Sequence, residues 1–224
     1  MTLCNDFIRP SLVRLTVVAL SVLPMAIAAS PSCAQEPVPF GLHAALDNVV
    51  PKDVENTAWS RLEHSRWLAD GKQNAPRTVY VFTDPNCPFC NKLWSDARPW
   101  VDSGKVQLRH VMVGILTPTS AGKAAALLNE KDPSTALATY ERNHVAQTSS
   151  GLASGRPRPL DDSGLKPLAS IPAAIQSQLE GNEKLMMALG LEATPAMVWR
   201  DETGTLRIMQ GVPDGALAHV FGPR

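Results

Sequence analysis

Uninterrupted apolar runs mark the strands that this sequence predicts. Residues Thr78–Thr83 are Thr-Val-Tyr-Val-Phe-Thr, β-branched and aromatic without polar alternation, which is typical of a strand buried on both faces. Val106–Ile115 predicts a second strand. Closer to the C-terminus, Ala196–Arg200 and Leu206–Met209 predict a hairpin around the turn Glu202-Thr203-Gly204.

A helical period of apolar positions precedes the first strand. Lys52–Asp70 places Val54, Ala58 and Leu62 on one face of a predicted helix, and Gly71 is well placed to end it. The short segment before it contains several prolines and predicts an extended lead-in.

Further helices are expected between the strands. The first runs from Pro88 to about Asp102 and is kinked at Pro99. Its inward stripe is Leu93, Trp94, Ala97 and Val101. The Ala- and Leu-rich stretch Ser120–His144 predicts two helices divided at Asp132-Pro133, whereas Thr, Ser, Gly and Pro dominate Val145–Pro167 and predict an irregular segment.

The C-terminal third returns to helical spacing. Its apolar positions are Ile171, Ile175 and Leu179. We expect Asn182 to cap a short helix over Glu183–Leu189, which Gly190 closes. Ala216–Phe221 predicts a terminal helix.

Residues 1–34 have the pattern of a secretory signal peptide. Arg9 and Arg14 precede the apolar stretch Leu15–Ala29, which is too short for a comfortable membrane span. The small residues at Ala26-Ile27-Ala28 and Ser32-Cys33-Ala34 offer two cleavage sites. We therefore expect export to the periplasm. The alternative is an uncleaved membrane anchor.

Composition narrows the function classes. The 224 residues contain 21 Lys+Arg and 21 Asp+Glu, and 44% of them are hydrophobic. A folded globular protein has this composition, and the charge balance argues against a nucleic-acid binder, whose surface is usually strongly basic. No nucleic-acid partner is expected.

The candidate chemistry is the dithiol Cys87-Pro88-Phe89-Cys90, which follows the first strand and begins a helix. A helix N-terminus favours a thiolate at Cys87, so this sulfur is expected to attack a substrate sulfur and Cys90 to resolve the mixed disulfide. A purely structural disulfide is disfavoured because so short a loop contributes little stability. A zinc site is disfavoured because no second Cys-x-x-Cys or His-x-x-x-His accompanies the pair. Neither a metal nor a cofactor is expected.

The chain resembles periplasmic thiol–disulfide interchange proteins of the DsbC/DsbG family, nearer to the DsbG branch. The matching segments are Val79–Cys90, Ala97–Arg109, Asn182–Met186 and Thr194-Pro195. The resemblance runs from about Thr57 to the C-terminus. It implies an α/β, thioredoxin-like fold in a catalytic domain over residues 76–224. A helical insertion at about residues 118–182 would lie between the Cys-x-x-Cys helix and the cis-proline strand.

The resemblance also implies site residues. Pro88 and Phe89 form the active-site dipeptide between the two catalytic cysteines. Thr194 and a cis Pro195 form the loop that faces Cys87 and binds substrate. Asp84 is a candidate proton acceptor for Cys90, and its alternative interpretation is a turn residue before a proline.

One departure from the family concerns assembly. Its characterised members have an N-terminal dimerisation domain, whereas the sequence here offers a lead-in at residues 35–51 and a linker helix at residues 52–75. We therefore expect a monomer.

The leading functional expectation is an exported thiol–disulfide oxidoreductase that reduces or isomerises disulfides in periplasmic cysteine-containing clients. A DsbD-like membrane electron donor would keep Cys87 reduced. One alternative is a monomeric net oxidant of the DsbA type, which Pro88 in the dipeptide also permits. The other is a chaperone-like or secretion-accessory binding module whose dithiol is dispensable.

Overall fold

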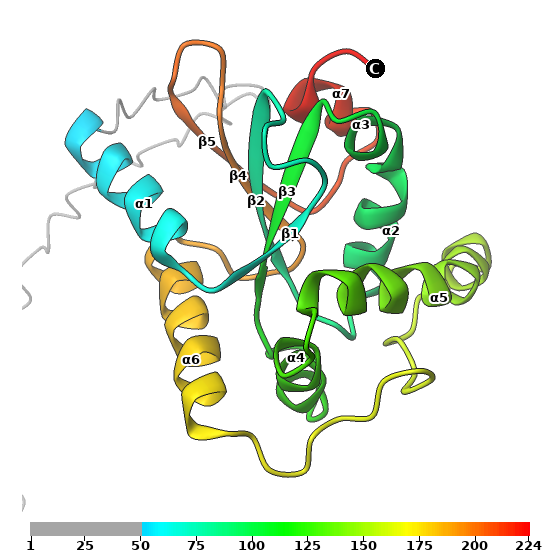
Figure 1. Ribbon diagram of the computed structural model, residues 1–224. Coiled ribbons are helices and arrows are strands. Elements are labelled where there is room, and N and C mark those ends of the chain that lie inside the picture. The colour runs from blue at the N-terminus through cyan, green and yellow to red at the C-terminus, as the bar shows by residue number, and fades with distance from the viewer. Residues whose placement is uncertain (1–50) are drawn as a thin grey trace, which may run out of the picture. The chain divides into compact units, whose positions relative to one another are not determined.

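The structure is a computed structural model that describes residues 51–224. The signal peptide predicted over residues 1–34 and the lead-in up to residue 50 lie outside the described residues. A five-stranded mixed sheet in the order β1-β3-β2-β4-β5 forms its centre (Figure 1). The strands are β1 (Trp67–Asp70), β2 (Arg77–Thr83), β3 (Val106–Met112), β4 (Ala196–Arg200) and β5 (Leu206–Gln210). The helices are α1 (Lys52–His64), α2 (Pro88–Asp96), α3 (Arg98–Asp102), α4 (Ser120–Leu128), α5 (Pro133–Ala153), α6 (Ala173–Ala188) and α7 (Ala216–Phe221).

The central strand β2 organises the sheet. It pairs parallel with β3 and antiparallel with β4, while β1 and β5 pair antiparallel at the two edges. Residues 79–83 of this strand are buried, because strands flank it and helices cover both faces of the sheet. The doubly buried strand and the C-terminal hairpin predicted from the sequence are both confirmed.

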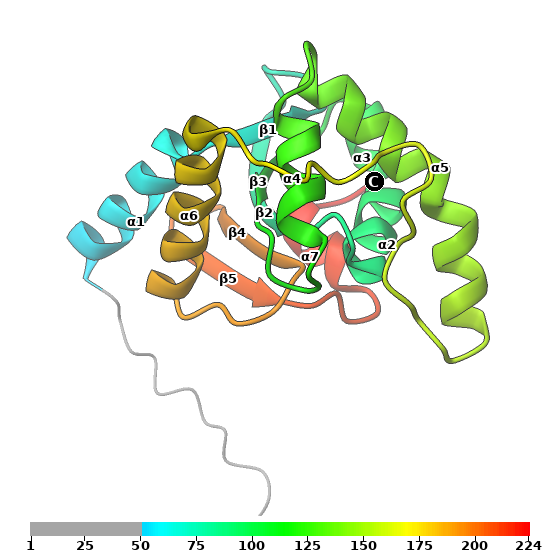
Figure 2. The ribbon, with the colours of Figure 1, turned by 90° about the horizontal axis from the view of Figure 1, so that it is seen from below.

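Alternating side chains of β2 face two separate cores. Figures 1 and 2 show the helices on the two faces of the sheet. Val79 and Val81 pack with α2, α3 and α7 on one face. Tyr80 and Phe82 pack with α1 and α6 on the other. Because successive strand residues point to opposite faces, one apolar run supplies both cores.

The helices between β3 and β4 form the expected insertion. α4, α5 and the first half of α6 enclose a third core, to which Leu68 and Met112 contribute from the sheet. This core lies at the end of β2 where the Cys-x-x-Cys segment begins (Figure 2). Among residues 51–224, no helix combines the length and the apolar character needed to cross a bilayer.

The linker helix predicted over residues 52–75 is wrong beyond His64. Residues Trp67–Asp70 form the edge strand β1 instead, so the sheet begins before residue 76. These residues are extended because they pair with the open edge of β3. The inward face of α1 also differs from the prediction: Val54 is 50% exposed, whereas Glu55 and Leu62 are buried.

Two other helix boundaries differ from the sequence prediction. α5 continues to Ala153, past the point at Val145 where an irregular segment was expected, because its end packs against α2 and buries Thr148. α6 runs unbroken through Asn182, which is buried and caps no helix. The predicted kink near Pro99 is confirmed as a break that separates α2 from α3.

The side chain of Asn182 explains why α6 is continuous. Its amide donates hydrogen bonds to the carbonyl oxygens of Arg66, at 2.8 Å, and Met112, at 2.9 Å. The residue therefore ties α6 to the sheet. It does not satisfy a helix end.

Candidate active site

The two cysteines of the predicted dithiol lie where β2 passes into α2. Cys87 is the N-cap of α2, and Pro88 occupies its first turn, where the missing N–H leaves no intrahelical hydrogen bond unmade. The backbone N–H of Cys90 donates to the Cys87 sulfur at 3.2 Å. Both cysteines are free thiols and only 2% exposed. The predicted position of Cys87 at a helix N-terminus is therefore present in the structure.

The pKa values of the two thiols are shifted in opposite directions. The pKa of Cys87 is lowered to about 7. The largest cause is a hydrogen bond from the Cys90 side chain, which outweighs the opposite effect of burial. Hydrogen bonds from the Thr194 side chain and from the backbone N–H groups of Cys90 and Phe89 lower the pKa further. Burial, followed by the neighbouring Cys87 sulfur, raises the pKa of Cys90 well above its ordinary value. Near neutral pH, Cys87 is thus the sulfur that ionises, and Cys90 retains its proton.

The loop before β4 faces this dithiol. The Thr194-Pro195 peptide bond is cis, as the resemblance implied. The Cys87 thiol donates to the carbonyl oxygen of Thr194 at 3.4 Å, although 107 positions separate the two residues. Phe89, in the dipeptide, is 46% exposed beside them. The structure therefore brings together all the residues predicted for the dithiol and its facing loop.

Asp84 is fully buried, and its carboxylate already has several hydrogen-bond partners. It accepts from the backbone N–H of Ile115 at 2.8 Å and of Leu116 at 2.9 Å. It also accepts from the N–H of Asn86 and the hydroxyl of Ser120, each at 2.8 Å. These contacts fix the loop before Cys87 and match the interpretation of Asp84 as a turn residue. The Cys90 thiol is not among the donors to this carboxylate, so a role of Asp84 as proton acceptor for Cys90 stays a prediction.

The insertion holds the active-site loop from its other side. The Tyr140 hydroxyl on α5 donates to the carbonyl oxygen of Pro85 at 2.7 Å. Lys123 on α4 is fully buried, and its ammonium donates to the Tyr140 hydroxyl and to the carbonyl oxygens of Leu160 and Asp161. These contacts anchor the segment after α5 close to the dithiol.

Glu141 is a site residue that the sequence reasoning missed. Its side chain on α5 is 1% exposed and accepts a 2.7 Å hydrogen bond from the amide of Asn91, the residue after Cys90. Burial raises the pKa of this carboxyl to about 8, although the hydrogen bond from Asn91 acts in the opposite direction and lowers it. The nearby Cys87 sulfur adds to the increase. A signal was available in the sequence, because Glu141 stands four positions after buried Leu137 on the inward stripe of the helix. Its partner on α2 could not be read from that spacing.

A metal site needs several ligating side chains close together. Across residues 51–224, no group of three or more His, Cys, Asp or Glu side chains is placed to hold a metal ion.

Comparisons with known proteins agree with this geometry. The thioredoxin-like domain family matches residues 68–219. The chain is 46% identical over 180 residues to the thiol:disulfide interchange protein DsbG of Pseudomonas aeruginosa, which covers 80% of this chain and 64% of that protein. It is 42% identical over 160 residues to DsbG of Escherichia coli, covering 70% of this chain and 56% of that protein. The chain thus spans less than two thirds of the length of these curated relatives.

Solved structures show the same fold at low sequence identity. The catalytic domain of Proteus mirabilis ScsC superposes with a TM-score of 0.56 at 21% identity, covering 76% of this chain and 96% of that domain. The two chains therefore share a fold. The chain belongs to the thioredoxin-like domain family, in which it is similar to the DsbG thiol:disulfide interchange proteins.

Proposed function

We propose that this protein is a thiol–disulfide oxidoreductase that exchanges disulfides with cysteine-containing client proteins in the periplasm. The observation that carries the proposal is the unequal acidity of its two thiols, with Cys87 near pKa 7 and Cys90 well above its ordinary value. Reversible exchange needs a nucleophilic thiolate next to a thiol that resolves the mixed disulfide. Similarity to two DsbG proteins supports the same chemistry.

The reaction proceeds in two exchanges in the reducing direction. The Cys87 thiolate attacks one sulfur of the client disulfide, and the other client sulfur leaves as a thiolate that takes up a proton. Cys90 then loses its proton and attacks the Cys87 sulfur, which releases the second client thiolate. The second client thiolate takes up the proton that Cys90 loses, and the first takes its proton from water. The products are a Cys87–Cys90 disulfide and a client dithiol, so the protein has passed two electrons to the client.

The surroundings of Cys87 suit an extended client chain. The backbone of Thr194 lies 3.4 Å from the Cys87 sulfur and offers hydrogen-bonding groups to a substrate strand. Phe89, Ile115 and Leu116 are each close to half exposed. Apolar side chains of this kind favour contact with unfolded clients, whose own apolar residues are accessible.

Substitution of each cysteine tests the proposed roles. With a small disulfide-bonded protein as substrate, Cys90→Ser should accumulate a covalent mixed disulfide at Cys87, and Cys87→Ser should form none. Equal trapping by both variants would contradict the assignment. Client binding that persists in both variants, without any exchange by the wild-type protein, would favour the alternative of a binding module.

We further propose that the net direction is reduction or isomerisation, with a DsbD-like membrane donor returning electrons to the dithiol. Thiol trapping in intact cells tests this direction. A mainly reduced Cys87–Cys90 pair supports it, and a mainly oxidised pair supports the alternative of a net oxidant. The monomer expected from the sequence stays a prediction, which light scattering on the purified protein tests.

A further inference from the structure

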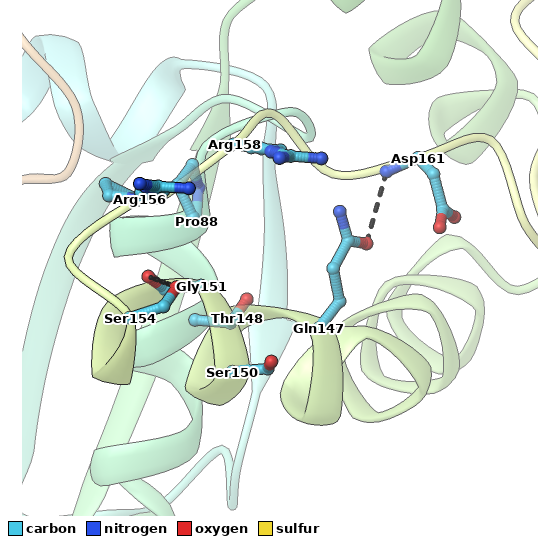
Figure 3. A pocket seen from close by; sticks show the side chains of 10 residues that line it. Pro88, Gln147, Thr148, Ser150, Gly151, Ser154, Arg156, Arg158 and Asp161 are labelled. Carbon is cyan, nitrogen blue, oxygen red and sulfur yellow. Dashed lines mark hydrogen bonds between the residues drawn. The ribbon is translucent and has the colours of Figure 1, made fainter.

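A pocket of about 500 Å³ opens beside Pro88, the residue that follows Cys87. Its walls come from the last turns of α5 and from the segment after this helix (Figure 3). The polar and charged residues that line it include Gln147, Thr148, Ser154, Arg156, Arg158 and Asp161. The volume lies within the range of ligand-binding pockets, roughly 300–1,000 Å³. A group held here would flank a client sulfur bonded to Cys87.

The wall of this pocket is fixed to the active-site loop. The backbone N–H of Leu160 donates to the carbonyl oxygen of Asn86 at 3.0 Å, immediately before Cys87. Gln147 binds the segment at two points: it donates to the carbonyl oxygen of Pro159 and accepts from the N–H of Asp161, as Figure 3 shows for Asp161. The backbone between them is therefore held in place relative to the dithiol.

This segment presents two arginines to the pocket. Figure 3 shows Arg156 and Arg158 on the chain that crosses over the end of α5, with Arg156 beside Pro88. Within residues 51–224, neither guanidinium forms a hydrogen bond or an ion pair. Two exposed positive groups without partners among the described residues therefore line the same pocket as Pro88, the residue after Cys87.

Asp161, the acid in the pocket lining, forms no ion pair with either arginine. Asp161 accepts a hydrogen bond from the Ser163 hydroxyl, and its carboxylate lies 3.2 Å from Nε2 of His144. The Ser163 hydrogen bonds lower the pKa of Asp161 to about 2, so its carboxylate is ionised and already has partners. The Thr148 hydroxyl, also in the wall, has no hydrogen-bond partner in the described part of the chain. The free hydrogen-bonding capacity of the pocket is thus mainly cationic.

We infer that this pocket binds carboxylate side chains that flank the reacting cysteine of a client polypeptide. The inference rests on the proposed function, because the pocket is filled by a chain whose sulfur is at Cys87. Planar guanidinium groups bind carboxylates through two parallel hydrogen bonds, which gives both affinity and orientation. Glutathione, a tripeptide, carries the same carboxylate chemistry, and the experiment below distinguishes this source from a client polypeptide.

The experiment compares two disulfide-linked reporter peptides that differ only in two positions near the cysteine, Glu in one and Gln in the other. Exchange rates are measured with the reduced wild-type protein and with the double variant Arg156→Gln/Arg158→Gln. A matched control, Arg61→Gln/Arg66→Gln, removes the same charge from exposed arginines outside this pocket. Glutathione disulfide serves as a third substrate. Binding of a Cys→Ser version of the Glu peptide is followed separately by fluorescence anisotropy.

We expect the wild-type protein and the control to react with the Glu peptide about fivefold faster than with the Gln peptide, a ratio typical of a few partly exposed charge pairs. This ratio should fall to about one in the Arg156/Arg158 variant, whose rate with the Gln peptide should not change, and it should weaken with added salt. An unchanged ratio in that variant, or no preference in the wild-type protein, would overturn the inference. The inference would also be overturned if the Arg156/Arg158 variant exchanged more slowly than the wild-type protein with glutathione disulfide but not with the Glu peptide. If the wild-type protein exchanged with neither peptide but bound the Cys→Ser version of the Glu peptide more tightly than the Arg156/Arg158 variant does, the proposed function would be contradicted and the pocket inference supported.

Discussion

The buried carboxyl of Glu141 allows a quantitative test of the site, through the substitution Glu141→Gln. The amide has nearly the same shape and can still accept the hydrogen bond that Asn91 now donates to the carboxylate. The change therefore removes one titrating group from the space between α5 and the dithiol helix while leaving packing nearly intact.

The magnitude follows from the shift in pKa. The pKa of Glu141 is raised from 4.5 to about 8 in the folded protein. Between these values the unfolded chain releases the proton and the folded chain retains it, so the free energy of unfolding falls as pH rises and levels off above 8. From about pH 5 to pH 8 this single group should lower the stability of the wild-type protein by roughly 3–4 kcal/mol, at 1.36 kcal/mol per pKa unit.

The assay is urea unfolding of the reduced protein, followed by tryptophan fluorescence at both pH values. Relative to wild type, Glu141→Gln should gain those roughly 3–4 kcal/mol between about pH 5 and pH 8, because groups shared by the two proteins cancel in the difference. Tyr140→Phe, on the same helix, is the control: it loses hydrogen bonds to Pro85 and Lys123 at every pH, so its deficit should stay constant. A stability difference between Glu141→Gln and wild type that is the same at both pH values would refute the reasoning.

Three other substitutions test the hydrogen bonds that support the active-site loop and tie α6 to the sheet. Asp84→Asn should lower the free energy of unfolding by about 2 kcal/mol, because an amide cannot accept from all the donors that its carboxylate now satisfies; urea unfolding checks this, and wild-type stability would contradict it. Lys123→Met should lower the free energy of unfolding by about 3 kcal/mol, because the carbonyl oxygens of Leu160 and Asp161 lose their donor. Amide hydrogen exchange should become faster in the segment after α5, and unchanged exchange there would argue against the anchoring role of Lys123. Asn182→Ala should lower the free energy of unfolding by about 2 kcal/mol, since one buried and one partly buried carbonyl group lose their donor. A loss below about 0.5 kcal/mol would mean that α6 is held to the sheet by packing alone.

The sequence predicted the parts of the molecule that local chemistry decides. The strand Thr78–Thr83 followed from an apolar run with no polar break, and the position of Cys87 followed from the turn residues and proline after it. A helix N-terminus is a local feature, so the acidity of Cys87 was accessible from the sequence as well.

What the sequence left open depends on partners distant along the chain. Residues Trp67–Asp70 form a strand because β3 offers an edge, and Asn182 stays within a helix because its amide bonds to two segments of the sheet region. The Glu141 carboxyl lies 50 positions from Asn91. No periodicity within either helix could identify that pair, which is why a buried acid next to the dithiol escaped the sequence reasoning.

The most direct test of the central claim is the pH dependence of cysteine alkylation in the reduced wild-type protein, with the labelled residue identified by mass spectrometry. The account predicts that label enters at Cys87, with a rate that rises through a midpoint near pH 7, while Cys90 stays unlabelled over the same range. A midpoint near the ordinary thiol value of 9, or faster labelling of Cys90, would contradict the claim that Cys87 is the activated nucleophile.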